Sequence, residues 1–235
     1  MQIVGVQNNS FIDFPGKVSM VIFTGGCNFN CYYCHNRHIL TPAKSNIVYS
    51  PSFLIKSLQR KKGFIDGVVI SGGEPTLQPD LKDFMAEVKH ETELPIKLDT
   101  NGTKPDLLIG LIKNGLVDYI AMDIKAPKNR YAELVDKNIN LDDIEQSIEV
   151  IKASGLDYEF RTTFAPVLTI DDIIELCEWI KGAKRYALQQ YNLPQNLGFY
   201  KDDRLEVPPH SKETLKQAFE HIQHKFGVAI LRGVG

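Results

Sequence analysis

The run CNFNCYYC places three cysteines within eight positions, at Cys27, Cys31 and Cys34. Cysteine thiolates bind zinc and iron, and a structural zinc site usually closes with four ligands. His35 could supply the fourth ligand, although adjacent ligands at Cys34 and His35 would strain a tetrahedral site. Three thiolates also suit a [4Fe–4S] cluster in which each binds one iron, so that the fourth iron stays open for another ligand. The run alone leaves both interpretations open.

Further polar clusters follow short apolar runs along the chain. They are SGGEPT (71–76), DTNG (99–102), MDIK (122–125), RTT (161–163) and QQYN (189–192). Paired glycines let a ligand approach the backbone closely, and the carboxylate of Glu74 can accept a hydrogen bond from an ammonium group. Asp99, Thr100, Asp123 and Lys125 add carboxylates, a hydroxyl and a cation. Each cluster alone is an ordinary strand end, but together they suit a zwitterionic small molecule.

The elements that position these clusters alternate between apolar runs and amphipathic stretches. The apolar runs are short, nearly continuous and rich in Val, Ile, Tyr and Thr, and they predict buried parallel strands at 18–23, 67–71, 95–100, 117–124, 158–164 and 185–191. The amphipathic stretches predict helices at 52–61, 79–90, 104–113, 141–153, 170–181 and 211–224. This alternation indicates a parallel α/β fold, either doubly wound or barrel-like. In both folds the active site lies at the C-terminal ends of the strands, where the polar clusters fall.

The composition describes one globular domain of 235 residues, with no low-complexity tract, fixed repeat or linker. A net charge of −2 gives no basis for binding nucleic acid or an anionic membrane. No apolar run approaches the roughly 20 residues that span a bilayer, and the N-terminus lacks the features of a signal peptide. We therefore expect a cytoplasmic protein, in which clustered thiols indicate metal rather than disulfides. Cys177 lies among apolar residues at helical spacing, which predicts a buried core position.

The run CNFNCYYC resembles the CxxxCxxC signature of the radical S-adenosylmethionine (SAM) superfamily, and GGEP resembles its second motif. The resemblance extends to the stretches DFPGKVSMVIFTGGCNFNCYYCHN, GVVISGGEPTLQPDL, KLDTNGTKPDLL, GLVDYIAMDIKAP, YEFRTTFAP and KRYALQQY. Together these stretches are similar to the activating proteins of anaerobic ribonucleoside-triphosphate reductase, which belong to the activases of glycyl radical enzymes. The resemblance covers about 13–191 and weakens beyond that range.

The resemblance implies a partial (β/α)6 TIM-like barrel with a parallel sheet, and a single radical SAM domain over 1–235. The core motifs span about 13–191, and 192–235 form a C-terminal extension. The positions that match the ligands of one [4Fe–4S] cluster are Cys27, Cys31 and Cys34. Cys177 is the only cysteine left over, so a second cluster is excluded. One departure is Asn30, where many activases have arginine, and it affects a peripheral contact rather than the cluster.

The resemblance also implies a SAM site in which the amino and carboxylate groups of SAM chelate the open iron. The positions that match SAM contacts are Tyr33, Gly72, Gly73, Glu74, Asp99, Thr100, Asp123, Lys125, Arg161 and Gln190. Tyr33 is expected beside the adenine, and the glycines with Glu74 at the amino group. Asp123 and Lys125 are expected near the carboxylate.

The implied activity is reductive cleavage of SAM, with an electron from a reduced flavodoxin or ferredoxin, to form a glycyl radical on a class III ribonucleotide reductase. One alternative is the activase of another glycyl radical enzyme, of the formate-lyase type. A second is a radical SAM synthase of a small molecule, such as 7-carboxy-7-deazaguanine synthase. A third is a zinc-stabilised binding module, which leaves GGEP, DTNG and MDIK without a role.

Overall fold

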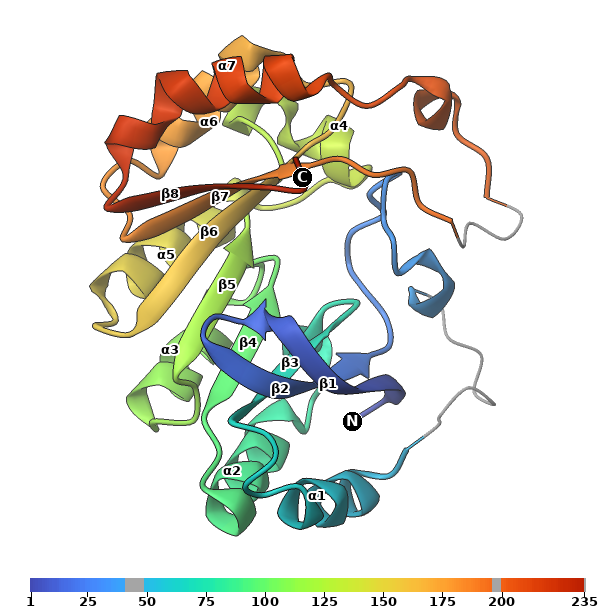
Figure 1. The fold of residues 1–235 in the computed structure, drawn as a ribbon, viewed down its shortest axis with the longest axis vertical. Helices are drawn as coiled ribbons and strands as arrows, with labels where there is room; N and C mark the ends of the chain where they lie inside the picture. The colour runs from blue at the N-terminus through green and yellow to red at the C-terminus, as the bar shows by residue number, and fades with distance from the viewer. Residues whose placement is uncertain (41–48, 196–199, 235) are drawn as a thin grey trace.

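The computed structural model describes residues 1–40, 49–195 and 200–234 of the chain. Eight strands form one sheet in the order in which they occur in the sequence. The strands are β1 (Ile3–Phe14), β2 (Lys17–Thr24), β3 (Gly67–Gly72), β4 (Ile96–Thr100), β5 (Tyr119–Asp123), β6 (Asp157–Phe164), β7 (Arg185–Gln190) and β8 (Val228–Arg232). β1 pairs antiparallel with β2, and every later pair is parallel. The sheet curves into a partial barrel with β1 and β8 at its two edges (Figure 1).

Helices cover the outer face of this sheet (Figure 1). They are α1 (Pro51–Arg60), α2 (Leu81–Thr92), α3 (Pro105–Lys113), α4 (Tyr131–Val135), α5 (Leu141–Ala153), α6 (Ile170–Trp179) and α7 (Lys212–Ile222). Short 3₁₀ turns lie at Arg37–Ile39, Pro75–Leu77, Lys128–Arg130, Asp203–Glu206 and Gln223–Lys225. Local signals fix several helix starts. Thr169 and Asp172 form a capping box at α6, and Ser211 caps α7 by accepting from Thr214 N over 3.1 Å.

Apolar side chains are buried on both faces of the parallel strands. In β2, Met20 and Ile22 belong to the large core between the sheet and the helices. Val21 points to the other side, where it joins a small cluster inside the barrel with Phe14 and Tyr119. Because both faces are covered, these strands are nearly continuous in apolar residues, which is the pattern that predicted them.

The predicted barrel is confirmed, and the structure extends it at both ends. The six predicted strands correspond to β2–β7, and the six predicted helices are all present. β1 was not predicted, because its polar middle, QNNS, breaks the apolar pattern and few of its residues are fully buried. β8 was not predicted either, and it adds a seventh parallel strand to the six expected. It lies at a sheet edge, where its side chains are only partly buried.

Candidate active site

A cavity of about 440 Å³ opens at the C-terminal ends of the parallel strands. It brings together the residues that the sequence singled out, with one exception. Those that line it are Cys27, Cys31, Tyr33, Cys34, Gly72, Gly73, Glu74, Asp99, Thr100, Asp123, Lys125 and Arg161. They come from the loop after β2 and from the ends of β3, β4, β5 and β6. Ser71, Asn101, Thr163 and Gln189 also line the cavity and were not among the predicted contacts.

The exception is Gln190, which is not among the residues that line the cavity. Its amide Nε2 donates to the carbonyls of His210 over 3.1 Å and Tyr191 over 3.2 Å. Gln189 lines the cavity instead, because neighbouring residues of a strand point to opposite faces. The structure therefore gives no support for a direct ligand contact by Gln190. The contact expected at Gln190 stays a prediction.

The three clustered cysteines lie on one loop and face this one cavity. Burial raises the pKa of Cys27 to about 12 and that of Cys31 to about 11, and it also raises the pKa of Cys34. A cysteine binds metal as the thiolate. Metal binding by these three cysteines therefore releases protons. Among the described residues, no three His, Cys, Asp or Glu side chains are grouped to hold a single metal ion. His35 lines the same cavity as the three cysteines.

Backbone N–H groups of GGEP hold the start of the cysteine loop. Gly73 N donates to Thr24 O over 2.9 Å, and Glu74 N donates to Gly26 O over 2.8 Å. A Cβ atom at Gly73 would lie 1.9 Å from Gly26 O, a distance that no side chain can adopt. Gly72 has φ +121°, which favours glycine, and its Cβ would lie 2.3 Å from Thr24 N. The glycines are therefore needed for close contact between two backbone segments.

Glu74 is buried, and its carboxylate is bonded entirely within the protein. Oε1 accepts from the hydroxyls of Thr76 over 2.6 Å and Thr100 over 2.8 Å, and from Thr76 N over 3.1 Å. Oε2 accepts from Asn101 N over 2.6 Å. Burial raises the pKa of Glu74 in spite of these donors. The carboxylate joins the loop after β3 to the loop after β4, which positions both segments.

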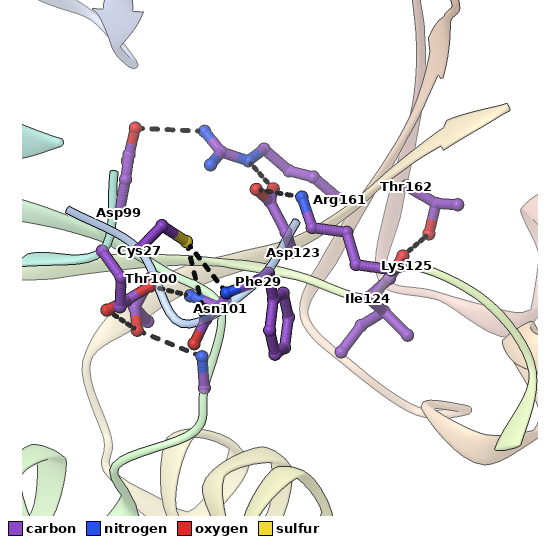
Figure 2. A network of polar contacts seen from close by, with 12 residues as sticks. Cys27, Phe29, Asp99, Thr100, Asn101, Asp123, Ile124, Lys125, Arg161 and Thr162 are labelled. Atoms are coloured by element: carbon purple, nitrogen blue, oxygen red, sulfur yellow. Dashed lines mark hydrogen bonds and ion pairs between the residues drawn. The ribbon is translucent and has the colours of Figure 1, made fainter. Parts of the chain in front are cut away.

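Five charged side chains from β4, β5 and β6 and the residues just after β5 form a row of ion pairs. Figure 2 shows Asp99, Arg161, Asp123 and Lys125 of this row. Asp99 forms ion pairs with Lys97 and with Arg161, whose Nη1 lies 3.4 Å from Asp99 Oδ2. Arg161 Nε donates to Asp123 Oδ1 over 2.8 Å. Lys125 Nζ donates to Asp123 Oδ2 over 3.0 Å. Three cations therefore alternate with two carboxylates.

The row carries one net positive charge and keeps both carboxylates ionised. Burial alone would raise the pKa of Asp99, but Arg161 and Lys97 outweigh it and lower that pKa. Burial opposes ionisation of Asp123 in the same way, and Arg161 and Lys125 lower its pKa. The row can thus bind a ligand that presents both an ammonium and a carboxylate.

Asn101 is a site residue that the sequence analysis missed, although it lies within the quoted DTNG cluster. Its Nδ2 lies 4.0 Å from Cys27 Sγ and donates to Asn28 Oδ1 over 2.8 Å (Figure 2). Thr103 N donates to Asn101 Oδ1 over 3.1 Å, which fixes the orientation of the amide. Phe29 N also donates to Cys27 Sγ, over 3.4 Å. One cysteine sulfur therefore has two N–H groups directed at it.

Cys177 lies away from the cavity. It is buried in the main core, as predicted, and burial raises its pKa to about 12.

No helix within the described ranges is long and apolar enough to cross a membrane.

Comparison with known proteins defines the family of the chain. Residues 21–180 match the radical SAM superfamily. A protein of Methanocaldococcus jannaschii that bears the name "Putative glycyl-radical enzyme activating enzyme MJ1227" is 38% identical over 192 residues, which are 80% of this chain and 78% of that protein. The pyruvate formate-lyase-activating enzyme of Clostridium pasteurianum is 26% identical over 217 residues, which are 88% and 87% of the two chains. The chain belongs to the radical SAM superfamily and is an enzyme of that family.

A solved structure agrees with this assignment at the level of the fold. SuiB of Streptococcus suis, bound to its precursor peptide SuiA, matches with a TM-score of 0.66 and 15% identity. The match covers 91% of this chain and 48% of SuiB, so the chain spans about half the length of that protein. Family membership implies a [4Fe–4S] cluster and SAM as cofactors. The site fits both groups, because three thiols and four members of the charged row, Asp99, Asp123, Lys125 and Arg161, line the same cavity.

Proposed function

We propose that this enzyme activates a glycyl radical enzyme, and that its partner is an anaerobic, class III ribonucleoside-triphosphate reductase. The observation that carries the activase assignment is the 38% identity to the Methanocaldococcus jannaschii activating enzyme. The choice of the reductase rests on the resemblance of DFPGK, YCHN and the later stretches to reductase activases. Asp13, the first residue of DFPGK, lines the cavity, which is consistent with a role for this segment at the site.

In this proposal Cys27, Cys31 and Cys34 hold one [4Fe–4S] cluster. When bound, the cluster supplies the electron that cleaves SAM to methionine and a 5′-deoxyadenosyl radical, which takes a hydrogen atom from a glycine of the partner. A reduced flavodoxin or ferredoxin is the proposed electron donor. The thiols open onto the same cavity as the charged row, which supports placing SAM beside the cluster.

Different side chains of the cavity are proposed to bind different parts of SAM. Asp123 and Lys125, with Asp99 and Arg161 beside them, orient the amino acid end through their alternating charges. Gly72 and Gly73 allow the backbone to approach this end closely. Tyr33 is proposed beside the adenine, and it is buried at the wall of the cavity. Thr100 donates a hydrogen bond to Glu74, which holds the end of β4 against the loop after β3.

The test combines the reduced enzyme, SAM and the class III reductase of the same organism under anaerobic conditions. We expect a glycine-centred doublet in the electron paramagnetic resonance spectrum and formation of methionine that depends on the reductase. A reductase in which the target glycine is replaced by alanine is the matched control, and the doublet should be absent. If SAM cleavage is equally fast without the reductase and no doublet forms, the reductase is not the partner. The same assay with a formate-lyase-type enzyme then distinguishes the alternative activase.

A further inference from the structure

The C-terminal extension contacts the cysteine loop directly, through a stacked pair. The Arg37 guanidinium lies over the ring of Tyr200, with 3.2 Å from Cζ to the ring centroid. The same guanidinium donates from Nη1 to Cys31 O over 2.9 Å and from Nη2 to Asn30 Oδ1 over 2.7 Å. Arg37 thus bonds the backbone carbonyl of Cys31, the middle cysteine, while the ring of Tyr200 covers the face of the Arg37 guanidinium.

A second stacked pair lies nearby, with the partners reversed. Here the extension supplies the cation, and Arg204 Cζ lies 4.4 Å from the ring centroid of Tyr32. Tyr32 is completely buried and directly follows Cys31. Arg204 Nη1 also donates to Glu133 O in α4 over 3.0 Å. An arginine stacked on a ring with its N–H groups bonded holds its neighbours in a defined geometry.

One carboxylate links the two pairs. Asp202 accepts from Tyr200 Oη over 2.8 Å, and from Arg204 Nε over 2.8 Å and Nη2 over 2.7 Å. We call Tyr200, Asp202 and Arg204 the clasp. The cysteine loop is held from another side as well, because Asn30 N donates to Val135 O over 2.8 Å. Asn30 Nδ2 also donates to Asp136 Oδ2 over 2.6 Å. Without the clasp, Arg37 would keep its hydrogen bonds to Cys31 and Asn30, but the aromatic ring that covers its guanidinium would no longer be held in place.

We propose that the clasp positions the cysteine loop for cluster binding, with Arg37 and Tyr32 transmitting its effect to Cys31. This inference rests on the proposed assignment of the three cysteines to a [4Fe–4S] cluster. A cluster with only three protein ligands has few bonds to the chain, so opening of the loop would release iron. Groups that orient metal ligands contribute strongly to metal affinity, typically about 10- to 100-fold. The clasp also gives the C-terminal extension a role in the active site.

The first experiment compares Asp202→Ala with Asp203→Ala in the full-length, reconstituted enzyme. The two substitutions remove the same charge from adjacent positions, but Asp203 is exposed and has no side-chain partner among the described residues. We expect Asp202→Ala to lose iron to an anaerobic chelator about 10- to 100-fold faster than the wild type. Asp203→Ala should lose iron at the wild-type rate. Thermal unfolding of each iron-free variant shows whether the fold itself has changed.

The second experiment separates the charge of Arg37 from its geometry. A nearby cation stabilises the reduced, more negative cluster and so raises its reduction potential. Arg37→Gln should therefore lower the midpoint potential and accelerate iron loss. Arg37→Lys keeps the charge but loses the planar fork that reaches two acceptors from two nitrogens and stacks on Tyr200, so it should lose iron faster with most of the potential retained. A role in folding alone would not produce this difference.

The results distinguish the two proposals. If the wild type binds no cluster, the cysteine assignment fails and the clasp proposal fails with it. If the wild type binds a cluster and Asp202→Ala retains iron as long as Asp203→Ala does, the clasp proposal alone is overturned. Tyr200→Phe keeps the ring over Arg37 and loses one hydrogen bond, so it should lose iron more slowly than Asp202→Ala.

Discussion

Arg161 on β6 donates from Nε to the carboxylate of Asp123 on β5 over 2.8 Å, and the parallel register places the two residues directly opposite each other. Both side chains are largely buried, at 15% and 29% exposed. Lys125 bonds the other carboxylate oxygen, so Asp123 cannot rotate freely toward a ligand. The pair therefore presents a preformed group of charges to the cavity.

Asp123→Asn should destabilise the protein even without cofactors, because it leaves Arg161 and Lys125 without their shared carboxylate. We expect a loss of about 3 kcal/mol in the free energy of unfolding, the lower end of the range for breaking a buried ion pair. Urea unfolding of the iron-free protein measures it. Glu87→Gln, at an exposed position of α2, is the control and should change stability by less than about 0.5 kcal/mol. Equal stability of both variants would contradict the role of the pair.

The two carboxylates of the charged row, Asp99 and Asp123, should make the free energy of unfolding fall at acid pH. The pKa values of Asp99 and Asp123 are lowered in the folded protein, because their cationic neighbours outweigh the effect of burial. Such groups contribute stability above their ordinary pKa of 3.8, and the contribution is lost as the pH falls through the folded values. The stability gap between wild type and Asp123→Asn should stay constant from pH 7 to about pH 5 and narrow below about pH 4. A gap that widens on acidification would refute this sign.

The sequence was sufficient to place most of the site, because the C-terminal ends of parallel strands meet at one edge of the sheet. Asp99, Asp123 and Arg161 each lie in a strand that its apolar pattern predicted, so their convergence followed from the fold. Cys27, Cys31 and Cys34 are close in sequence and could not be far apart. The strand pattern could not predict to which side of the sheet a side chain near a strand end points, as at Gln190.

Contacts between distant segments account for the features that the sequence did not predict. Tyr200 and Arg204 lie in a stretch without periodic apolar residues, and their partners Arg37 and Tyr32 are far away in the chain. The hydrogen bonds of Glu74 are a further example. Its carboxylate was expected to face an ammonium group, but the loop after β4 provides donors that the sequence could not place.

Glu74→Ala should therefore lower stability in the absence of SAM. The change leaves buried donors of Thr76, Thr100 and Asn101 without their acceptor. Each unsatisfied buried group costs about 1–3 kcal/mol. Urea unfolding of the iron-free variant should show at least one such loss, compared with Glu87→Ala as the exposed control. Unchanged stability with weaker SAM binding would instead make Glu74 a direct ligand.

Gly73→Ala should displace the cysteine loop. The added Cβ would lie 1.9 Å from Gly26 O, so the two backbone segments must separate. We expect impaired cluster assembly, measured as iron and sulfide bound per chain after anaerobic reconstitution. Gly110→Ala is the matched control, since its Cβ meets nothing within 4 Å. At that position in α3, alanine should stabilise the helix by up to about 1 kcal/mol and leave iron binding unchanged. Normal iron binding by Gly73→Ala would contradict the contact.

The four cysteines should separate into two classes on substitution by alanine. Cys27, Cys31 and Cys34 face the cavity, so replacing any one of them should abolish stable iron binding and SAM cleavage. Cys177 lies in α6 and is buried in the main hydrophobic core, and its replacement should leave iron binding at the wild-type level. Its cost should appear in the free energy of unfolding, on the order of 1 kcal/mol for a lost buried group. Anaerobic reconstitution followed by iron analysis and visible absorption tests all four variants. Retention of the cluster by any one of the first three, or its loss in Cys177→Ala alone, would refute the three-ligand assignment.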